Sequence, residues 1–271
     1  MTEPFTITSP QNPRIKQLLV LQQKSSERRH LGMFVVEGGR ELAHCVNGGF
    51  EIDTVFHCPQ LYKASSADFT LLHSMLPHGV TVVDVTPQVY EKIAYRGSTE
   101  GIIATVKTRP STLDSLTVSD QPLIVVLESV EKPGNIGAVL RSADAAGADA
   151  VIVCDPLTDL YNPNLIRASV GAFFSVPCVA CTSEACIAFL KKHGISILTA
   201  QLQDSSLYYG TDMRRPVAIV MGTEATGLTT QWRDAADAHI RIPMLGRGDS
   251  LNVSVSTAIL LYEAVRQRQQ Q

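Results

Sequence analysis

The sequence of 271 residues lacks the features that would place a protein in or across a membrane. No apolar run approaches the length that a membrane-spanning helix requires. The start, Met1-Thr-Glu-Pro-Phe5, has no basic segment followed by an apolar one, so we expect no secretory signal peptide. Because 45% of the residues are hydrophobic, general disorder is excluded. We therefore expect a folded, cytoplasmic protein with no membrane partner.

The chain also lacks a strong metal-binding signature. It has six cysteines and no secretory signal, so these are expected to be reduced core residues. Cys178-Val-Ala-Cys181, with Cys186 and His193 downstream, could suggest a zinc or redox site, but there is no second C-x-x-C pair. Core packing is the favoured interpretation of these thiols, and no metal is expected.

Two nucleotide-binding signatures are present only in part. Val217–Gly227 is typical of a buried strand that ends in a polar turn with phosphate-loop spacing, but Leu228 occupies the position of the essential lysine. A strand, helix and strand around Gly134 and Gly137 end at Asp155, but the third glycine of the dinucleotide fingerprint is missing. A phosphate loop is therefore excluded, and a nicotinamide oxidoreductase is poorly supported. An ordinary buried strand with a glycine turn remains possible for the first stretch taken alone.

Positive charge is not in excess overall, since the net charge is −3, but it is concentrated near the N-terminus. A local patch is sufficient for binding nucleic acid. This basic cluster can be a solvated helix face or an RNA-binding surface. Because its charge is positive, the second interpretation is a serious one. The cluster consists of Arg14, Lys16, Lys24, Arg28 and Arg29.

Residues 1–108 alternate helix and strand patterns and predict one α/β domain. A helix is expected over 13–23, with Ile15, Leu18 and Leu19 at helical spacing. Thr86 and Pro87 are expected to cap and begin another helix. Residues 109–121 are rich in Pro, Ser, Thr and Asp and indicate a linker. Strands are expected over 34–37, 52–56, 82–85 and 102–106, and a helix from Gly38 through Cys45.

Residues 122–271 predict a second α/β domain with strands near 123–127, 151–154, 195–198, 217–221 and 239–243. A helix is expected from Asn135 to about residue 146, and Arg141 falls off its apolar stripe. That stripe is Ile136, Val139, Leu140 and Ala143. Asn252 is expected to cap the final helix. The apolar positions of the final helix include Val255, Ala258, Ile259, Tyr262 and Val265, with Leu260 and Leu261 added.

Three segments of the second half of the chain carry a family resemblance through their sequences, order and spacing. They are Asn135–Ala143, Val220–Leu228 and Ile242–Val255. Together they closely resemble the three motifs of the SpoU/TrmH family of RNA ribose 2′-O-methyltransferases, within the SPOUT superfamily. The N-terminal part, including Ile7–Lys16 and Phe34–Gly38, is similar to the family's ribosomal-protein-like RNA-binding domain. The resemblance implies an α/β fold with a mostly parallel sheet, a deep trefoil knot in the C-terminal domain, and a smaller N-terminal α/β domain.

The resemblance also implies a cofactor, partners and site residues. S-adenosylmethionine is the implied cofactor, RNA the implied substrate, and a homodimer through the C-terminal domain the implied assembly. Ribosomal RNA is favoured, and transfer RNA or a non-catalytic RNA-binding factor are the alternatives. The implied catalytic residues are Asn135, Arg141, Glu224, Ser250 and Asn252. The implied cofactor-binding residues are Val220, Met221, Gly222, Thr223, Ile242, Met244 and Leu251.

Methyl transfer to a ribose hydroxyl requires that the hydroxyl be positioned and lose its proton. The three motifs contain no histidine or cysteine, and a guanidinium is a poor base because it stays protonated. We therefore favour Arg141 as the group that binds the target phosphate and stabilises developing negative charge. A role as base, aided by that phosphate, stays open. The plainer alternatives are a surface arginine, a surface turn acid at Glu224, and helix caps at Asn135 and Asn252.

Overall fold

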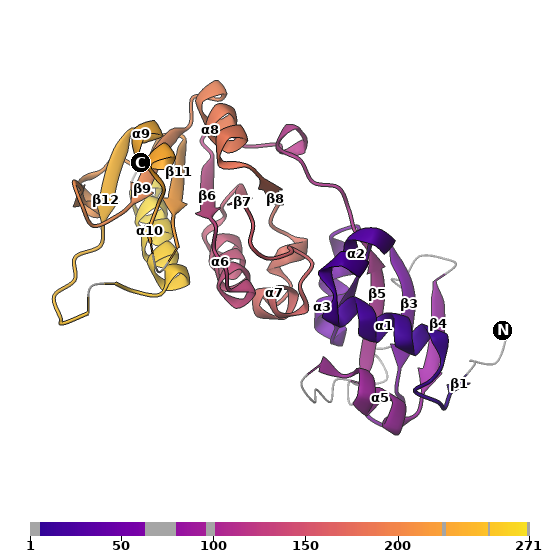
Figure 1. Cartoon of the computed structure of the whole chain (residues 1–271). Coiled ribbons are helices and arrows are strands. Elements are labelled where there is room, and N and C mark those ends of the chain that lie inside the picture. Colours follow the sequence, from indigo (N-terminus) through magenta and orange to yellow (C-terminus); the bar gives the residue numbers. More distant parts are fainter. Residues whose placement is uncertain (1–5, 63–79, 96–100, 224–225, 249, 270–271) are drawn as a thin grey trace. The chain divides into compact units, whose positions relative to one another are not determined.

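The computed structural model describes residues 6–62, 80–95, 101–223, 226–248 and 250–269 (Figure 1). The chain divides into two compact units, of which the first is Met1–Arg109 with Tyr161–Phe174 and the second is Pro110–Leu160 with Ser175–Gln271. Each unit has its own sheet and its own core of buried apolar residues. No helix among the described residues is both long and apolar enough to span a membrane.

The first unit contains a mixed five-stranded sheet in the order β1-β4-β3-β5-β2. Strand β4 pairs in parallel with β1 and β3, whereas β5 pairs antiparallel with β3 and β2. The strands are β1 (Thr6–Ile7), β2 (Met33–Glu37), β3 (Ile52–His57), β4 (Thr81–Val85) and β5 (Ile102–Lys107). The helices of this part include α1 (Pro13–Gln23), α2 (Ser25–Leu31), α3 (Gly39–Asn47) and α5 (Pro87–Ile93).

Local sequence signals explain where helices α1 and α5 begin. The side chain of Asn12 accepts a hydrogen bond from the backbone N–H of Arg14, and Pro13 supplies the fixed φ of a first helical residue. Thr86 caps α5 in the same way, with its hydroxyl accepting from the N–H of Val89. The predicted helix over 13–23 and the predicted cap at Thr86 are confirmed.

A segment from the second half of the chain, Tyr161–Phe174, completes the first unit. It carries α7 (Pro163–Ser169) and the short helix η3 (Ala172–Phe174), and its aromatic rings pack with those of two residues from the N-terminal part. Because packed aromatic rings bury large apolar areas, these contacts stabilise the segment against the N-terminal part of the same unit. The cluster consists of Phe34, Phe50, Tyr161, Phe173 and Phe174.

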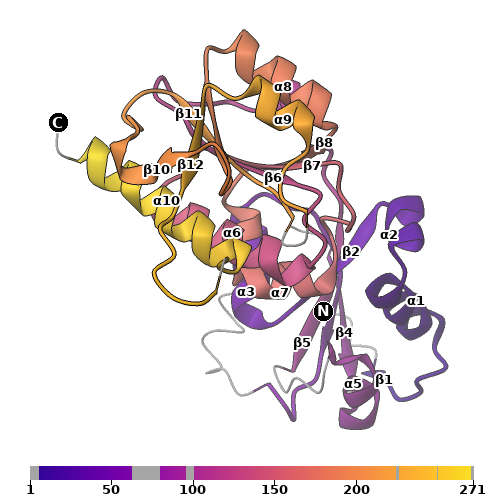
Figure 2. The ribbon, with the colours of Figure 1, turned by 60° about the vertical axis from the view of Figure 1, so that its left-hand side comes forward.

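The second unit is built on a seven-stranded sheet in the order β10-β12-β9-β11-β6-β7-β8 (Figure 2). All of its pairings are parallel, so every strand ends at the same edge of the sheet. The strands are β6 (Leu123–Glu128), β7 (Ala150–Cys154), β8 (Cys178–Cys181), β9 (Ser196–Ala200), β10 (Ser206–Leu207), β11 (Val217–Met221) and β12 (Ala238–Arg241).

Two pairs of helices cover the faces of this sheet. Helices α8 (Ser183–Lys192) and α9 (Thr230–Ala235) lie together, and α6 (Pro133–Ala146) packs along α10 (Val253–Arg268) on the opposite side (Figure 2). Alternate side chains of β6, β7, β9 and β11 join the core under α8 and α9, as the two-residue period of a strand requires. The core stripe predicted for α6 is buried throughout and is confirmed.

Two helix predictions need correction. Helix α6 begins at Pro133 rather than at Asn135, because proline is well suited to the first turn and Lys132 is the capping residue. In α10 the buried stripe is displaced from the predicted one, since Val255 and Tyr262 are exposed. Its buried residues are Val253, Thr257, Leu260, Leu261, Glu263 and Ala264.

Candidate active site

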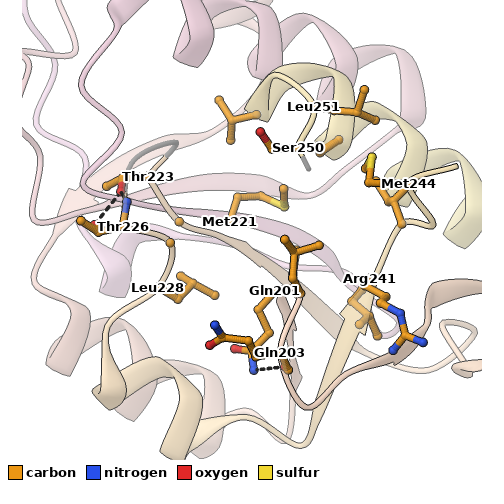
Figure 3. A pocket seen from close by; sticks show the side chains of 18 of the residues that line it. Gln201, Gln203, Met221, Thr223, Thr226, Leu228, Arg241, Met244, Ser250 and Leu251 are labelled. Carbon is orange, nitrogen blue, oxygen red and sulfur yellow. Dashed lines mark hydrogen bonds between the residues drawn. The ribbon is translucent and has the colours of Figure 1, made fainter. Parts of the chain in front are cut away.

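A cavity of about 430 Å³ opens at the carboxyl edge of the parallel sheet in the second unit (Figure 3). Its floor is formed where β9, β11 and β12 end, at Ala200, Met221 and Arg241. Ligands of open parallel sheets bind at this edge, where strand ends expose backbone groups. The volume and the mixture of apolar and polar lining suit a small organic cofactor.

The turn after β11 forms one wall of the cavity. Thr223 and Gly227 exchange two backbone hydrogen bonds of 3.3 and 3.1 Å across it, and the Thr223 hydroxyl also lies 2.8 Å from that of Thr226. Gly222 is sterically required, since a Cβ there would lie 2.4 Å from the carbonyl carbon of Gly227. Gly227 has a φ of +68°, which also favours glycine. The two glycines therefore let the chain fold back closely beside the cavity.

Glu128, at the end of β6, anchors the far side of this turn. Its buried carboxylate accepts a 2.9 Å hydrogen bond from the backbone N–H of Thr229 and a 2.6 Å hydrogen bond from the hydroxyl of that residue. Hydrogen bonds to an ionised group are among the stronger ones in proteins. Glu128 was not predicted from the sequence, although its place next to the carboxyl end of a predicted strand could have indicated it.

The third motif forms the opposite wall of the cavity. Ile242, Met244, Ser250 and Leu251 line it, and Figure 3 shows Met244, Ser250 and Leu251 around the same space as Met221. Among the described residues of this segment, Leu245 stands out because 97% of its surface is exposed. The second and third motifs, which are separate in sequence, thus come together around one cavity.

A second cavity of about 210 Å³ adjoins the first. Both are lined by Gly222, Thr223 and Val253, and the second also reaches Asn135 at the start of α6. The side chain of Asn252 donates a 3.2 Å hydrogen bond to that of Asn135, which joins the first motif to the third. Asn252 also caps α10, as predicted, by accepting from the N–H of Ser254.

Two further predicted site residues line neither cavity, and a third is not among the described residues. Val220 is fully buried inside β11 and lines neither cavity. Arg141 is exposed on α6, lines neither cavity, and makes no ion pair with another described residue. Glu224 lies outside the described residues. The roles predicted for these residues therefore stay predictions.

Several cavity residues were missed by the sequence analysis, and Gln201 is the most informative of them. Its amide nitrogen donates a 2.9 Å hydrogen bond to the carbonyl of Gln203, but its buried Oε1 has no hydrogen-bond partner among the residues that the structure describes (Figure 3). A buried acceptor without a partner is costly unless a ligand supplies a donor. Gln201 directly follows β9, which is the signal that could have found it. The other missed lining residues include Gln203, Thr226, Leu228, Arg233 and Arg241.

The described lining of the two cavities bears on the chemistry that is possible there. It contains the cations Arg233, Arg241 and Lys132 and the anion Glu131, but no histidine or cysteine. A site of this kind can hold a nucleoside through apolar walls and backbone groups, and an anionic group through its arginines. The Gly222 turn and the unpartnered Oε1 of Gln201 both fit S-adenosylmethionine, which offers adenine and ammonium N–H donors.

In the first unit, the predicted basic cluster is only partly at the surface. Arg14, Lys16, Lys24 and Arg29 are exposed. Arg28 is only 3% exposed, and its guanidinium donates to the backbone carbonyls of residues 21 and 22. Its assignment to an RNA-binding surface is therefore wrong, because these bonds hold α2 against the end of α1.

Comparison with known proteins matches two separate parts of the chain. Residues 122–262 match the SpoU rRNA Methylase family, and residues 12–104 match the MRM3-like substrate binding domain. The 23S rRNA (uridine(2479)-2′-O)-methyltransferase of Streptomyces viridochromogenes is 31% identical in an alignment of 270 residues that covers 97% of this chain and 92% of that protein. The 23S rRNA (guanosine-2′-O-)-methyltransferase RlmB of Escherichia coli K12 is 39% identical over 73% of this chain and 84% of its own.

Solved structures give the same assignment. An RNA 2′-O ribose methyltransferase superposes with a TM-score of 0.84 and 38% identity, over 98% of this chain and 100% of that one. An AdoMet-bound rRNA methyltransferase from Sinorhizobium meliloti gives a TM-score of 0.87 and 28% identity, over 96% and 97% of the two chains. The predicted fold class, enzyme class and cofactor are confirmed, whereas the knot stays a prediction. The chain belongs to the SpoU rRNA methylase family.

Proposed function

We propose that the protein transfers a methyl group from S-adenosylmethionine to a ribose 2′-hydroxyl of ribosomal RNA. The observation that best supports this proposal is the cavity that the second and third motifs form at the edge of the sheet. The hydrogen bond between Asn252 and Asn135 links this cavity to the first motif. The ribosomal substrate is supported by the names of the relatives, which act on 23S rRNA. A cytoplasmic location belongs to the same proposal.

Within this proposal, the bound cofactor supplies an electrophilic methyl group. Backbone groups of Met221, Gly222 and Thr223, and of Ile242, Met244 and Leu251, hold its adenosine and methionine parts. The Oε1 of Gln201 is buried in the same cavity with no partner in the described part of the chain, and it would accept a hydrogen bond from one of the cofactor's N–H groups. The Ser250 hydroxyl lies on the opposite wall, where a polar group can help to orient the incoming ribose.

Arg141 is proposed to bind the phosphate next to the target ribose. Its side chain is exposed and can approach a phosphate with both guanidinium N–H pairs. Since the described cavity lining has no histidine or cysteine, stabilisation of the developing oxyanion by this cation is the favoured role. A role as base, aided by the phosphate, remains the alternative. Glu224 stays in the proposed catalytic set through the resemblance of its motif alone.

The position of Arg141 supports a further part of the proposal, a homodimer through the second unit. Arg141 follows Asn135 by six helical residues, which is about 9 Å along the axis and roughly 240° around it. An exposed arginine that lines neither cavity of its own chain is suited to a partner's cavity. The faces available for this contact include Ala145 on α6 and Val255 and Tyr262 on α10, all exposed. Burying them between two chains would remove apolar surface from water.

The dimer and the sharing of sites can be tested together. Sedimentation equilibrium should give twice the 29.4 kDa mass of the chain. A mixture of Arg141→Ala and Asn252→Ala protomers should recover part of the activity, because one site in each mixed dimer would have both residues intact. A fully active monomer would contradict the proposal, and an inactive mixture would contradict shared sites.

The first unit is proposed to hold the RNA. The match to a substrate-binding domain and the exposed Arg14, Lys16, Lys24 and Arg29 support this role. Because phosphate contacts release counterions, affinity should fall steeply as salt rises. Replacing these four residues with glutamine should weaken RNA binding and flatten its salt dependence, and unchanged binding would remove the role.

The decisive assay uses purified protein, radiolabelled S-adenosylmethionine and protein-free ribosomal RNA, followed by ribose-methylation mapping. One methylated ribose is expected. Transfer RNA serves as the competing substrate. Preferential methylation of transfer RNA would show that it, and not ribosomal RNA, is the substrate. If the protein binds RNA and cofactor but transfers no methyl group, the non-catalytic alternative holds. Tight binding of NAD instead of S-adenosylmethionine would overturn the cofactor assignment.

A further inference from the structure

Three cysteines that are scattered in sequence meet on one side of the sheet in the second unit. The Sγ atoms of Cys154, Cys181 and Cys186 all lie within 4.8 Å of one another. Cys154 ends β7, Cys181 ends β8, and Cys186 lies in the first half of α8. Cys154 and Cys181 are paired in register, so their side chains leave the sheet on the same face. We name this group the thiol triad.

The geometry points to a binding site for a divalent thiophilic metal ion, with zinc as the ion that it suits best. This inference does not depend on the proposed methyl transfer. Zinc–sulfur bonds of about 2.3 Å in a tetrahedral site place ligand sulfurs about 3.8 Å apart. The triad is already within 4.8 Å, so an inward shift of about 1 Å or less would suffice. Side-chain rotation about the Cα–Cβ bonds can supply such a shift.

The surroundings of the triad restrict its chemistry to the three thiols. Asp155, next to Cys154, is committed to the start of α8, since its carboxylate accepts from the N–H and hydroxyl of Ser183 at 3.2 and 2.5 Å. The same hydroxyl accepts a 2.9 Å hydrogen bond from the indole of Trp232. These bonds fix α8, and therefore Cys186, relative to the two strand ends. Ligands held in place by neighbouring hydrogen bonds bind a metal more strongly.

Charge and access favour a divalent ion with a water molecule as its fourth ligand. Cys154 and Cys186 are fully buried, whereas Cys181 is partly exposed, so solvent can reach the cluster from the Cys181 side. Three thiolates around Zn²⁺ leave a net charge of −1, compared with −2 around a monovalent ion. Because buried charge is costly, the divalent ion is favoured. Soft sulfur ligands also select thiophilic ions over Mg²⁺ or Ca²⁺.

The triad differs from the cysteine group that the sequence suggested. Cys178 is three residues from Cys181, so it leaves β8 on the opposite face of the sheet. The ring of His193 stacks near that of Phe189, with 4.5 Å between ring centroids. Neither residue belongs to the group that the described residues form. Cys154, which lies 27 positions before Cys181, takes their place.

The test uses the full-length protein, kept reduced and stripped of metal. Titration with Co²⁺ should give sulfur-to-cobalt charge-transfer absorption and the visible bands of a tetrahedral site, saturating at one ion per chain. Zinc should displace the cobalt. Zinc should also raise the melting temperature, because an ion that binds only the folded state stabilises it. Absence of saturable cobalt absorption would overturn the inference.

Matched variants assign the ligands. Cys181→Ser should lose the cobalt absorption and the zinc-dependent rise in melting temperature, whereas Cys178→Ser should keep both. Equal loss in the two variants, or retention in both, would overturn the assignment. If Cys181→Ser does not fold, X-ray absorption on the wild-type zinc form decides. Three sulfur neighbours at about 2.3 Å are expected, and a shell of nitrogen and oxygen only would refute the site.

Discussion

The backbone of Gly227 approaches Gly222 so closely that we expect Gly222→Ala to distort the turn beside the cavity. The added methyl group would lie 2.4 Å from the carbonyl carbon and 2.6 Å from the carbonyl oxygen of Gly227. Both obstacles are backbone atoms, so no side-chain rotation can relieve the clash and the turn must move by about 1 Å. That movement would break the two hydrogen bonds between Thr223 and Gly227, at a cost of about 0.5–1.5 kcal/mol each.

The expected result is therefore a loss of about 1–3 kcal/mol in cofactor binding, or roughly fivefold to 150-fold in Kd. Isothermal titration with S-adenosylmethionine measures the affinity, and circular dichroism checks the fold. Gly246→Ala is the matched control, since a Cβ there meets no atom within 4 Å. If Gly222→Ala bound the cofactor as tightly as the control, the turn would not be the wall of the cofactor site.

Three further substitutions test other parts of the structure. Glu128→Ala should lower both the free energy of unfolding and the cofactor affinity by about 1.5–3 kcal/mol, because the hydrogen bonds to Thr229 are lost. Unchanged cofactor affinity would show that Glu128 does not position the turn. Arg28→Ala should destabilise the protein by about 1–3 kcal/mol without changing the salt dependence of RNA binding, and Arg29→Ala should do the reverse. The pKa of Glu263 is lowered by its hydrogen bond with Arg266, so this pair stabilises the protein above the ordinary glutamate pKa of about 4.3. The contribution is lost as the pH falls below that value, and Glu263→Gln should abolish this part of the acid sensitivity in pH-dependent unfolding.

Much of the fold could be predicted because local signals agreed with the tertiary structure. Thr86 followed by proline is a strong helix start, and the i, i+3, i+4, i+7 stripe of α6 points to one buried face. Three predicted strands of the parallel sheet, over 123–127, 151–154 and 217–221, are continuous apolar runs, as strands buried on both faces require. In these elements the local sequence pattern is compatible with only one type of secondary structure and one buried face.

Other elements could not be predicted because the deciding contacts are distant in sequence. Helix α10 carries apolar residues almost all round, so its sequence does not say which stripe meets α6 and β11. A basic run does not show that Arg28 turns inward to two carbonyl groups. The Tyr161–Phe174 segment joins the first unit through aromatic contacts with residues more than a hundred positions away.

The candidate site shows the same division. The motifs identified part of the lining through family resemblance, but they did not include Gln201 or Glu128, which lie at the ends of neighbouring strands. The thiol triad required the register of β7 against β8, which brings Cys154 to Cys181. Sequence spacing emphasised Cys178 instead, because two cysteines three residues apart are read as a pair.

We expect methyl transfer by this chain to a ribose 2′-hydroxyl of ribosomal RNA to depend on Arg141. The most direct measurement is methyl transfer by wild-type, Arg141→Ala and Arg141→Lys proteins, with nuclease digestion and mass spectrometry of the RNA product. We expect one 2′-O-methylated nucleotide with the wild type and none with either variant, although both variants should still bind S-adenosylmethionine. Lysine should fail because an ammonium cannot reproduce the planar fork of a guanidinium. A base-methylated product, or full activity in Arg141→Ala, would contradict the account.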